Sequence, residues 1–111
     1  MKILTFLLMI MISGSFAYSQ KLEKLKTYAY DWNKLEVVKT KSGERRQIYE
    51  GYTNDLAYFE VHVTTLNPGK APHGSHVHAD GEELIIVKEG LIEQSINGVK
   101  KVVGPRSVIL A

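Results

Sequence analysis

The sequence predicts an all-β domain, and three observations lead to that prediction. From Trp32 onward, short segments rich in β-branched and aromatic residues alternate with turn residues. The dipeptide Asn97-Gly98 joins two of these segments and suits the positive φ angles of a type I′ hairpin turn. No heptad or internal repeat occurs between Gln20 and Ala111. Short strands joined by short turns are typical of a sandwich or barrel, and we expect a small jelly-roll barrel.

Turn-forming residues such as Ser42-Gly43 separate the predicted strands. The longest strand segment alternates apolar and polar side chains, which is the pattern of a half-buried strand. The run from Leu84 to Val87 is apolar throughout, and it predicts a strand buried on both faces. In chain order, the predicted strands are residues 35–40, 46–50, 56–66, 84–87, 91–96, 99–103 and 107–110.

The amino-terminal residues have the three parts of a secretory signal peptide. Lys2 is followed by an apolar run from Ile3 to Ile12 and then by small residues that end at Ser19. The run is shorter than the roughly 20 residues of a membrane-spanning helix, so we expect no stable membrane anchor. The protein is therefore predicted to be exported, to the periplasm or the medium. The predicted organisation is a signal peptide at 1–19, a lead-in segment at 20–31 and the β domain at 32–111.

The composition excludes several kinds of partner and site. Fourteen Lys and Arg stand against 12 Asp and Glu, and a net charge of +2 is too balanced to indicate nucleic-acid binding. The chain has no cysteine, which removes disulfides and thiolate sites. A small domain of this kind must be held together by its core, by a metal ion or by assembly. The isolated basic pairs Arg45-Arg46 and Lys100-Lys101 are predicted to be solvated surface.

Three of the four histidines lie within six residues, and acidic residues follow them closely. Residues two apart on an extended backbone project to the same side, so His76 and His78 can present imidazole nitrogens to one ion. A carboxylate from the next strand, at Glu83, would complete a face of two histidines and one carboxylate. Such a ligand set suits Fe, Mn, Ni, Cu or Zn and leaves positions open for water or substrate.

Other interpretations of this segment stay open. It could be a solvated surface loop, with Asp80 among its acidic residues, because short histidine-rich tracts are weakly specific. Periodicity does not choose between Glu82 and Glu83, since both alternating sets of the following strand are apolar. His73 does not follow the two-residue alternation, and we interpret it as a loop residue or one that supports the ligands.

Strand parity also suggests residues that could line a pocket. His62 lies beside Glu60 in a predicted strand, and we interpret it as a side chain of the interior or of the surface. The pocket-lining candidates by parity are Tyr58, Glu60, His62 and Gln94.

Residues 69–90 resemble the first conserved motif of the cupin superfamily. That motif has a Gly, then His-x-His, three or four residues, Glu, six residues and Gly. Here His76-Val77-His78 is followed by four residues, Glu83, six residues and Gly90. One departure is that six residues separate Gly69 from His76 where the family has five. The resemblance implies a double-stranded β-helix and favours Glu83 over Glu82, with His76, His78 and Glu83 as ligands of a divalent metal ion.

A second cupin motif usually supplies a fourth ligand, within the pattern Gly, five residues, Pro-x-Gly, two residues, His. The segment from Gly104 to Leu110 resembles its opening, and the sequence ends before the Pro-x-Gly turn and the histidine. We therefore expect a barrel that is incomplete at its C-terminal end, with unpaired strand edges that encourage association. Cupins are often dimers, so the resemblance also implies a homodimer.

The expected function is that of an exported, cupin-like protein that binds a divalent metal ion in a β-barrel. The resemblance allows small-molecule chemistry of the dioxygenase, isomerase, lyase or aminohydrolase type, and it does not decide whether the protein is an enzyme. One alternative is a non-catalytic cupin that binds a small ligand. A second is a loop that scavenges metal without a folded site, and a third is a truncated, non-functional fragment.

Overall fold

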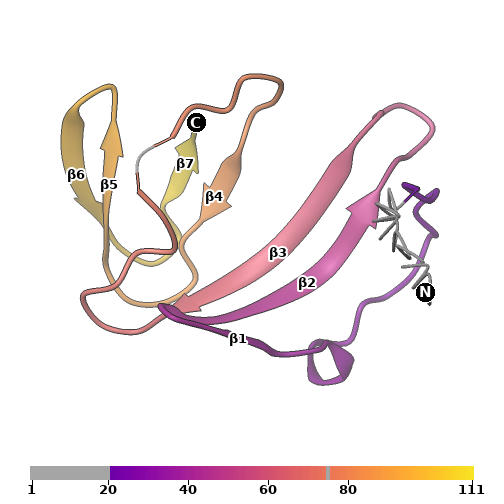
Figure 1. The fold of residues 1–111 in the computed structure, drawn as a ribbon, viewed down its shortest axis with the longest axis horizontal. Helices are drawn as coiled ribbons and strands as arrows, with labels where there is room; N and C mark the ends of the chain where they lie inside the picture. The colour runs from indigo at the N-terminus through magenta and orange to yellow at the C-terminus, as the bar shows by residue number, and fades with distance from the viewer. Residues whose placement is uncertain (1–20, 75) are drawn as a thin grey trace, which may run out of the picture. The chain divides into compact units, whose positions relative to one another are not determined.

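The computed structural model describes residues 21–74 and 76–111, and there the chain forms strands and one short 3₁₀ helix (Figure 1). This confirms the all-β class. The predicted signal peptide, residues 1–19, lies outside the described residues. The elements are η1 Trp32–Lys34, β1 Val38–Thr40, β2 Gly43–Gly51, β3 Phe59–Leu66, β4 Leu84–Ile86, β5 Ile92–Ile96, β6 Val99–Val103 and β7 Val108–Leu110.

These strands form three separate sheets. One has the strand order β1-β2-β3, and the others pair β4 with β7 and β5 with β6. Strands β2 and β3 are the longest, and they run in opposite directions (Figure 1). No sheet among residues 21–74 and 76–111 closes into a barrel. The jelly-roll barrel therefore stays a prediction.

The segment before β3 differs from the sequence prediction. The predicted strand began at Leu56, whereas β3 begins at Phe59. The Thr53 hydroxyl oxygen accepts hydrogen bonds from the backbone N–H groups of Asp55 and Leu56, at 3.2 and 3.0 Å. The N–H of Thr53 also donates to the Leu56 carbonyl, 2.9 Å away. These local bonds use the backbone groups that a strand would need, so the turn extends further than its residue types indicated.

The 3₁₀ helix η1 was also not predicted, because Trp32 was assigned to the β region. The Asp31 carboxylate accepts a hydrogen bond from the backbone N–H of Asn33 at 3.0 Å and so caps this turn. The Arg46 guanidinium lies 4.3 Å from the centre of the Trp32 ring. Arg46 is thus packed on an aromatic face instead of being only solvated surface, as its basic pair had predicted.

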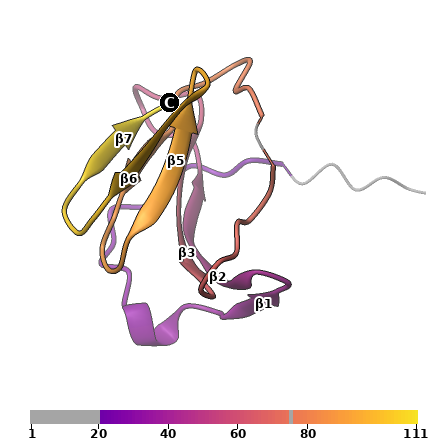
Figure 2. The same cartoon turned by 90° about the vertical axis from the view of Figure 1, so that its left-hand side faces the viewer.

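The β5–β6 hairpin confirms the prediction from Asn97-Gly98. Strand β5 pairs antiparallel with β6, and Ile96 opposite Val99 closes the ladder at the turn. Asn97 has φ 50° and Gly98 has φ 77°, as a type I′ turn requires. Figures 1 and 2 show β5 and β6 as one hairpin.

The most buried apolar side chains among the described residues lie in the β4–β7 ladder and at Val87, directly after β4. Val87 is 5% exposed and Ile109 is 7% exposed. The opposite face of the ladder is open, with Leu84 at 62% and Ile86 at 64%. The apolar run predicted burial on both faces, and the structure shows it on one. Strands β4 and β7 form a two-stranded sheet with apolar side chains on both faces, and one of these faces is exposed.

The lead-in segment is held to the end of β2. Lys24 forms an isolated parallel bridge with Tyr52. The Leu25 N–H donates to the Tyr52 carbonyl at 2.9 Å, and the Tyr52 N–H donates to the Glu23 carbonyl at 3.1 Å. Gly51 is buried beside this contact, where a Cβ atom would collide with the Glu23 carbonyl oxygen.

The described chain divides into two compact units. One contains residues 21–37 and 45–63, and the other contains Val38–Glu44 and Thr64–Ala111. Nothing in this division tests the predicted boundary between residues 31 and 32. Across residues 21–74 and 76–111, no helix has the length and apolar character needed to cross a membrane.

Candidate functional site

The three clustered histidines lie next to one another in the loop that precedes β4. The ring centroids of His73 and His76 are 4.2 Å apart, and those of His76 and His78 are 4.4 Å apart. Both pairs meet edge to face, at interplanar angles of 89° and 68°. The structure therefore brings together the two predicted histidine ligands, and it places His73 beside them.

These separations can be compared with those around a bound metal ion. An imidazole nitrogen binds such an ion at roughly 2.1 Å, which puts two ring centroids roughly 4.6 Å apart when the nitrogens bind at 90° and roughly 5.3 Å apart at a tetrahedral angle. The His76 and His78 ring centroids are 4.4 Å apart, which is nearer to the first value and is also the spacing of two rings packed edge to face. The donor types also fit, because neutral imidazoles and a carboxylate bind borderline divalent metals.

Glu83 is placed by the backbone ladder and reaches the histidines with its side chain. Its N–H donates to the Ala111 carbonyl at 2.8 Å, and the Ala111 N–H donates back at 2.9 Å. The β4–β7 pairing is thereby extended by one residue on each strand. An oxygen of the Glu83 carboxylate lies 3.1 Å from Nε2 of His78.

The two competing glutamates differ in position. Glu83 is half-buried, on the same side of the strand as Ile85 and Val87, whereas Glu82 is exposed. Asp80 is exposed as well. The hydrogen bonds between Glu83 and Ala111 determine which side of the strand each glutamate faces. The sequence pattern gave no information about this pairing.

The candidate ligands form pairwise contacts and are open to solvent. The side chains of His78 and Glu83 are each 36% exposed. Within the described part of the chain, no three His, Asp or Glu side chains have their donor atoms gathered as a metal site would need. The assignment of His76, His78 and Glu83 as ligands therefore stays a prediction.

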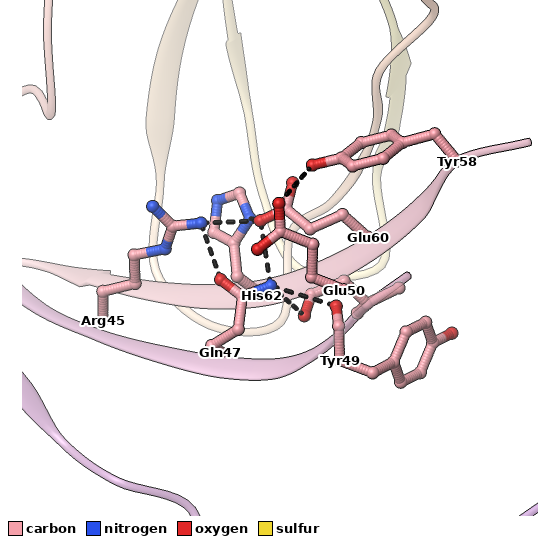
Figure 3. Close-up of polar contacts among 8 residues, drawn as sticks. Arg45, Gln47, Tyr49, Glu50, Tyr58, Glu60 and His62 are labelled. Atoms are coloured by element: carbon pink, nitrogen blue, oxygen red, sulfur yellow. Dashed lines mark hydrogen bonds and ion pairs between the residues drawn. The ribbon is translucent and has the colours of Figure 1, made fainter. Parts of the chain in front are cut away.

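A second polar cluster lies on strands β2 and β3, around the carboxylate of Glu60 (Figure 3). One Glu60 oxygen accepts hydrogen bonds from Arg45 Nη2 at 2.6 Å, His62 Nδ1 at 2.9 Å and Gln47 Nε2 at 3.0 Å. Arg45 Nη2 also donates to the Gln47 side-chain oxygen at 2.9 Å. Figure 3 shows Tyr49 with its ring directed away from these groups.

Burial and the neighbouring side chains of this cluster shift the pKa of the Glu60 carboxyl. Burial alone would raise the pKa. The hydrogen bond from Gln47, the charge and hydrogen bond of His62 and the charge of Arg45 more than offset burial, so the pKa lies below its usual value. Nearby, Tyr58 donates to Glu50 at 3.0 Å, and this bond is the main reason that the Tyr58 pKa is raised.

Sequence analysis found part of this cluster. Parity suggested Glu60 and His62, and both are half-buried in the cluster. It missed Gln47, and it assigned Arg45 to solvated surface, because a basic pair gives no sign of a partner 15 residues away. The other basic pair does contain an exposed residue, since Lys100 is 71% exposed and contacts Glu93 at 3.2 Å. Gln94 lines a small cavity of about 290 Å³ with residues of β6 and β7.

Comparison with known proteins found no matching family model, curated protein or solved structure.

Proposed function

We propose that the protein is an exported, cupin-like metal-binding protein whose ion is held by His76, His78 and Glu83. The observation that carries the proposal is the contact between the His78 imidazole and the Glu83 carboxylate, 3.1 Å apart, with the His76 ring against His78. The contact joins the loop to the β4–β7 ladder, which would make the ligand set depend on the fold. The proposal includes the jelly-roll architecture as the fold of the protein.

Each residue would have a defined role. His76 and His78 would donate neutral imidazole nitrogens, and Glu83 would supply a negative charge from a position fixed by the strand ladder. When bound, the metal ion would act as a Lewis acid or redox centre for a small molecule. The solvent exposure of His78 and Glu83 would leave the remaining positions accessible to that molecule.

The test is a calorimetric titration of the chain from Gln20 onward with Mn²⁺, Ni²⁺, Cu²⁺ and Zn²⁺, and with Fe²⁺ under anaerobic conditions. His76→Ala and His78→Ala should each weaken binding of the preferred ion by at least about tenfold. His62→Ala removes a histidine from the other compact unit and serves as the matched control. Equal binding by wild type, His76→Ala and His78→Ala would refute the proposed ligands.

A second measurement separates a folded site from a loop that scavenges metal. A synthetic peptide of residues 69–90 contains all three proposed ligands and lacks the ladder partner of Glu83. The peptide should bind the preferred ion more weakly than the folded chain, because folding prearranges the ligands. Equal affinity of peptide and protein would contradict the fold-dependent site.

The export proposal has its own test. The full gene product should lose residues 1–19 when it is produced in a secreting host, and mass spectrometry of the exported protein should find Gln20 at its amino terminus. An uncleaved protein retained inside the cell would contradict export.

A further inference from the structure

Four aromatic rings form a continuous chain in the compact unit that contains the lead-in segment. The centroids of Tyr28 and Tyr30 are 5.4 Å apart, those of Tyr30 and Tyr49 are 5.1 Å apart, and those of Tyr49 and Phe59 are 5.1 Å apart. Tyr28 is 70% exposed, and Tyr30 and Phe59 are exposed by more than a third. Partly exposed aromatic rings that contact one another mark a candidate binding site.

These rings line a cavity of about 510 Å³, which we call the aromatic groove. This volume lies within the range of sites that take small molecules. The bridge between Lys24 and Tyr52 holds the lead-in segment beside the end of β2 and so forms one wall. Tyr49 of β2 and Phe59 of β3 contribute to the other wall. The groove is therefore built by backbone pairing.

The polar groups of the groove are hydrogen-bonding groups and cations. The polar residues that line it are three tyrosines together with Lys24, Lys26, Thr27, Thr53 and Asn54. No Asp or Glu is among the described residues that line the groove. A ligand that fits must present an apolar face to the rings, many hydroxyls to the polar groups and a negative charge to the lysines.

We propose that the aromatic groove binds a small saccharide that carries a carboxylate, such as a uronic acid. The C–H face of a sugar ring packs against the electron-rich face of an aromatic ring, and its hydroxyls pair with tyrosine, Thr53 and Asn54. The carboxylate is ionised at neutral pH and is attracted to Lys24 and Lys26. This site goes beyond the proposed metal function, because it shares no residue with the proposed ligands.

The test uses the chain from Gln20 onward in the presence of a chelator, with D-glucuronate as probe and D-glucose as the neutral comparison. Calorimetry gives the affinities, and aromatic NMR spectra show which tyrosine rings respond. Glucuronate should bind saturably and shift the ring signals of Tyr28 and Tyr30. Glucose should bind about tenfold more weakly, because it lacks the charge that Lys24 and Lys26 attract. The His78→Ala variant should bind glucuronate as the wild type does.

Two variants locate the site. Tyr28→Ala should weaken glucuronate binding by about tenfold through loss of the stacked ring. The high exposure of Tyr28 means that this change should leave the fold intact. Tyr58→Ala is the matched control, since Tyr58 is 53% exposed and does not line the groove. The double variant Lys24→Gln/Lys26→Gln should bind glucuronate and glucose about equally.

Three results would overturn the proposal. The first is no saturable binding of glucuronate, and the second is an equal loss of binding in Tyr28→Ala and Tyr58→Ala. The third is tighter binding of tetraglutamate than of glucuronate, dependent on the two lysines and indifferent to Tyr28. That outcome would identify the occupant as an acidic peptide.

Discussion

The carboxylate of Glu83 lies 3.1 Å from Nε2 of His78, although Glu83 belongs to a strand ladder and His78 to the preceding loop. The backbone of Glu83 is fixed by two hydrogen bonds to Ala111, and its side chain is therefore directed by the pleat. Glu82 is one residue earlier and points to the opposite side of an extended chain. A contact between loop and ladder thus distinguishes two glutamates that the sequence pattern could not separate.

Replacement of Glu83 should weaken metal binding, whereas replacement of Glu82 should leave it nearly unchanged. Glu83→Gln removes the charge that contacts His78 and should weaken binding of the preferred divalent ion by at least about tenfold. Glu82→Gln removes the same charge one residue away and should change the affinity by less than about twofold. Calorimetric titration of both variants measures the difference. A larger loss in Glu82→Gln would show that the other glutamate is the ligand.

The lowered pKa of Glu60 predicts how stability depends on pH. The folded state holds the ionised carboxylate more favourably than the unfolded chain does, so Glu60 adds stability above its unfolded pKa of about 4.5. This contribution should be lost as the pH falls through the lower folded pKa. Glu60→Gln should be less stable than wild type by about 1 kcal/mol at pH 7, and the difference should shrink by pH 3.

Urea unfolding followed by circular dichroism between pH 3 and pH 7 measures this dependence. Glu36→Gln is the control, because Glu36 is exposed in the same compact unit and should keep the wild-type pH profile. A difference between wild type and Glu60→Gln that stays constant over this pH range would contradict the role of the Glu60 charge.

Gly98 has the positive φ angle that the β5–β6 turn requires. Gly98→Ala should lower the free energy of unfolding by about 1–2 kcal/mol, since an L-residue with a side chain is strained in the left-handed region. Gly81→Ala is the matched control, because no atom lies within 4 Å of the Cβ it would add and its φ is not in the left-handed region. Urea unfolding compares the two variants. Equal free energies of unfolding for Gly98→Ala and Gly81→Ala would show that a side chain at position 98 causes no strain in the turn.

The contact at Gly51 should control attachment of the lead-in segment. Gly51→Ala places a Cβ against the Glu23 carbonyl oxygen and 2.9 Å from the Leu25 side chain, which should break the bridge at Lys24. Trypsin should then cut after Lys24 and Lys26 faster by on the order of tenfold, because cleavage needs a detached segment. Gly74→Ala adds a Cβ in open space and should leave the cutting rate unchanged. Unchanged cleavage in Gly51→Ala would disprove the attachment.

Several features of this protein could be predicted from local sequence because their causes are local. The β5–β6 hairpin follows from the two residues of its turn, Asn97-Gly98, whose φ preferences act without distant partners. The all-β class follows in the same way from short alternating segments between turn residues. The turn at Thr53 is also local, but its hydroxyl hydrogen bonds compete with the strand and are not visible in an apolar pattern.

Other features were decided by tertiary structure, because their causes join residues that are distant in the chain. The side of the strand on which the Glu83 side chain lies depends on the two backbone hydrogen bonds between Glu83 and Ala111. The Glu60 cluster depends on Arg45, 15 residues away, and the aromatic groove depends on the bridge between Lys24 and Tyr52. The sequence by itself determined the all-β class, the hairpin turn and the candidate ligand types. Pairing between strands determined which of the side chains meet, since only a specific register brings them within hydrogen-bonding distance.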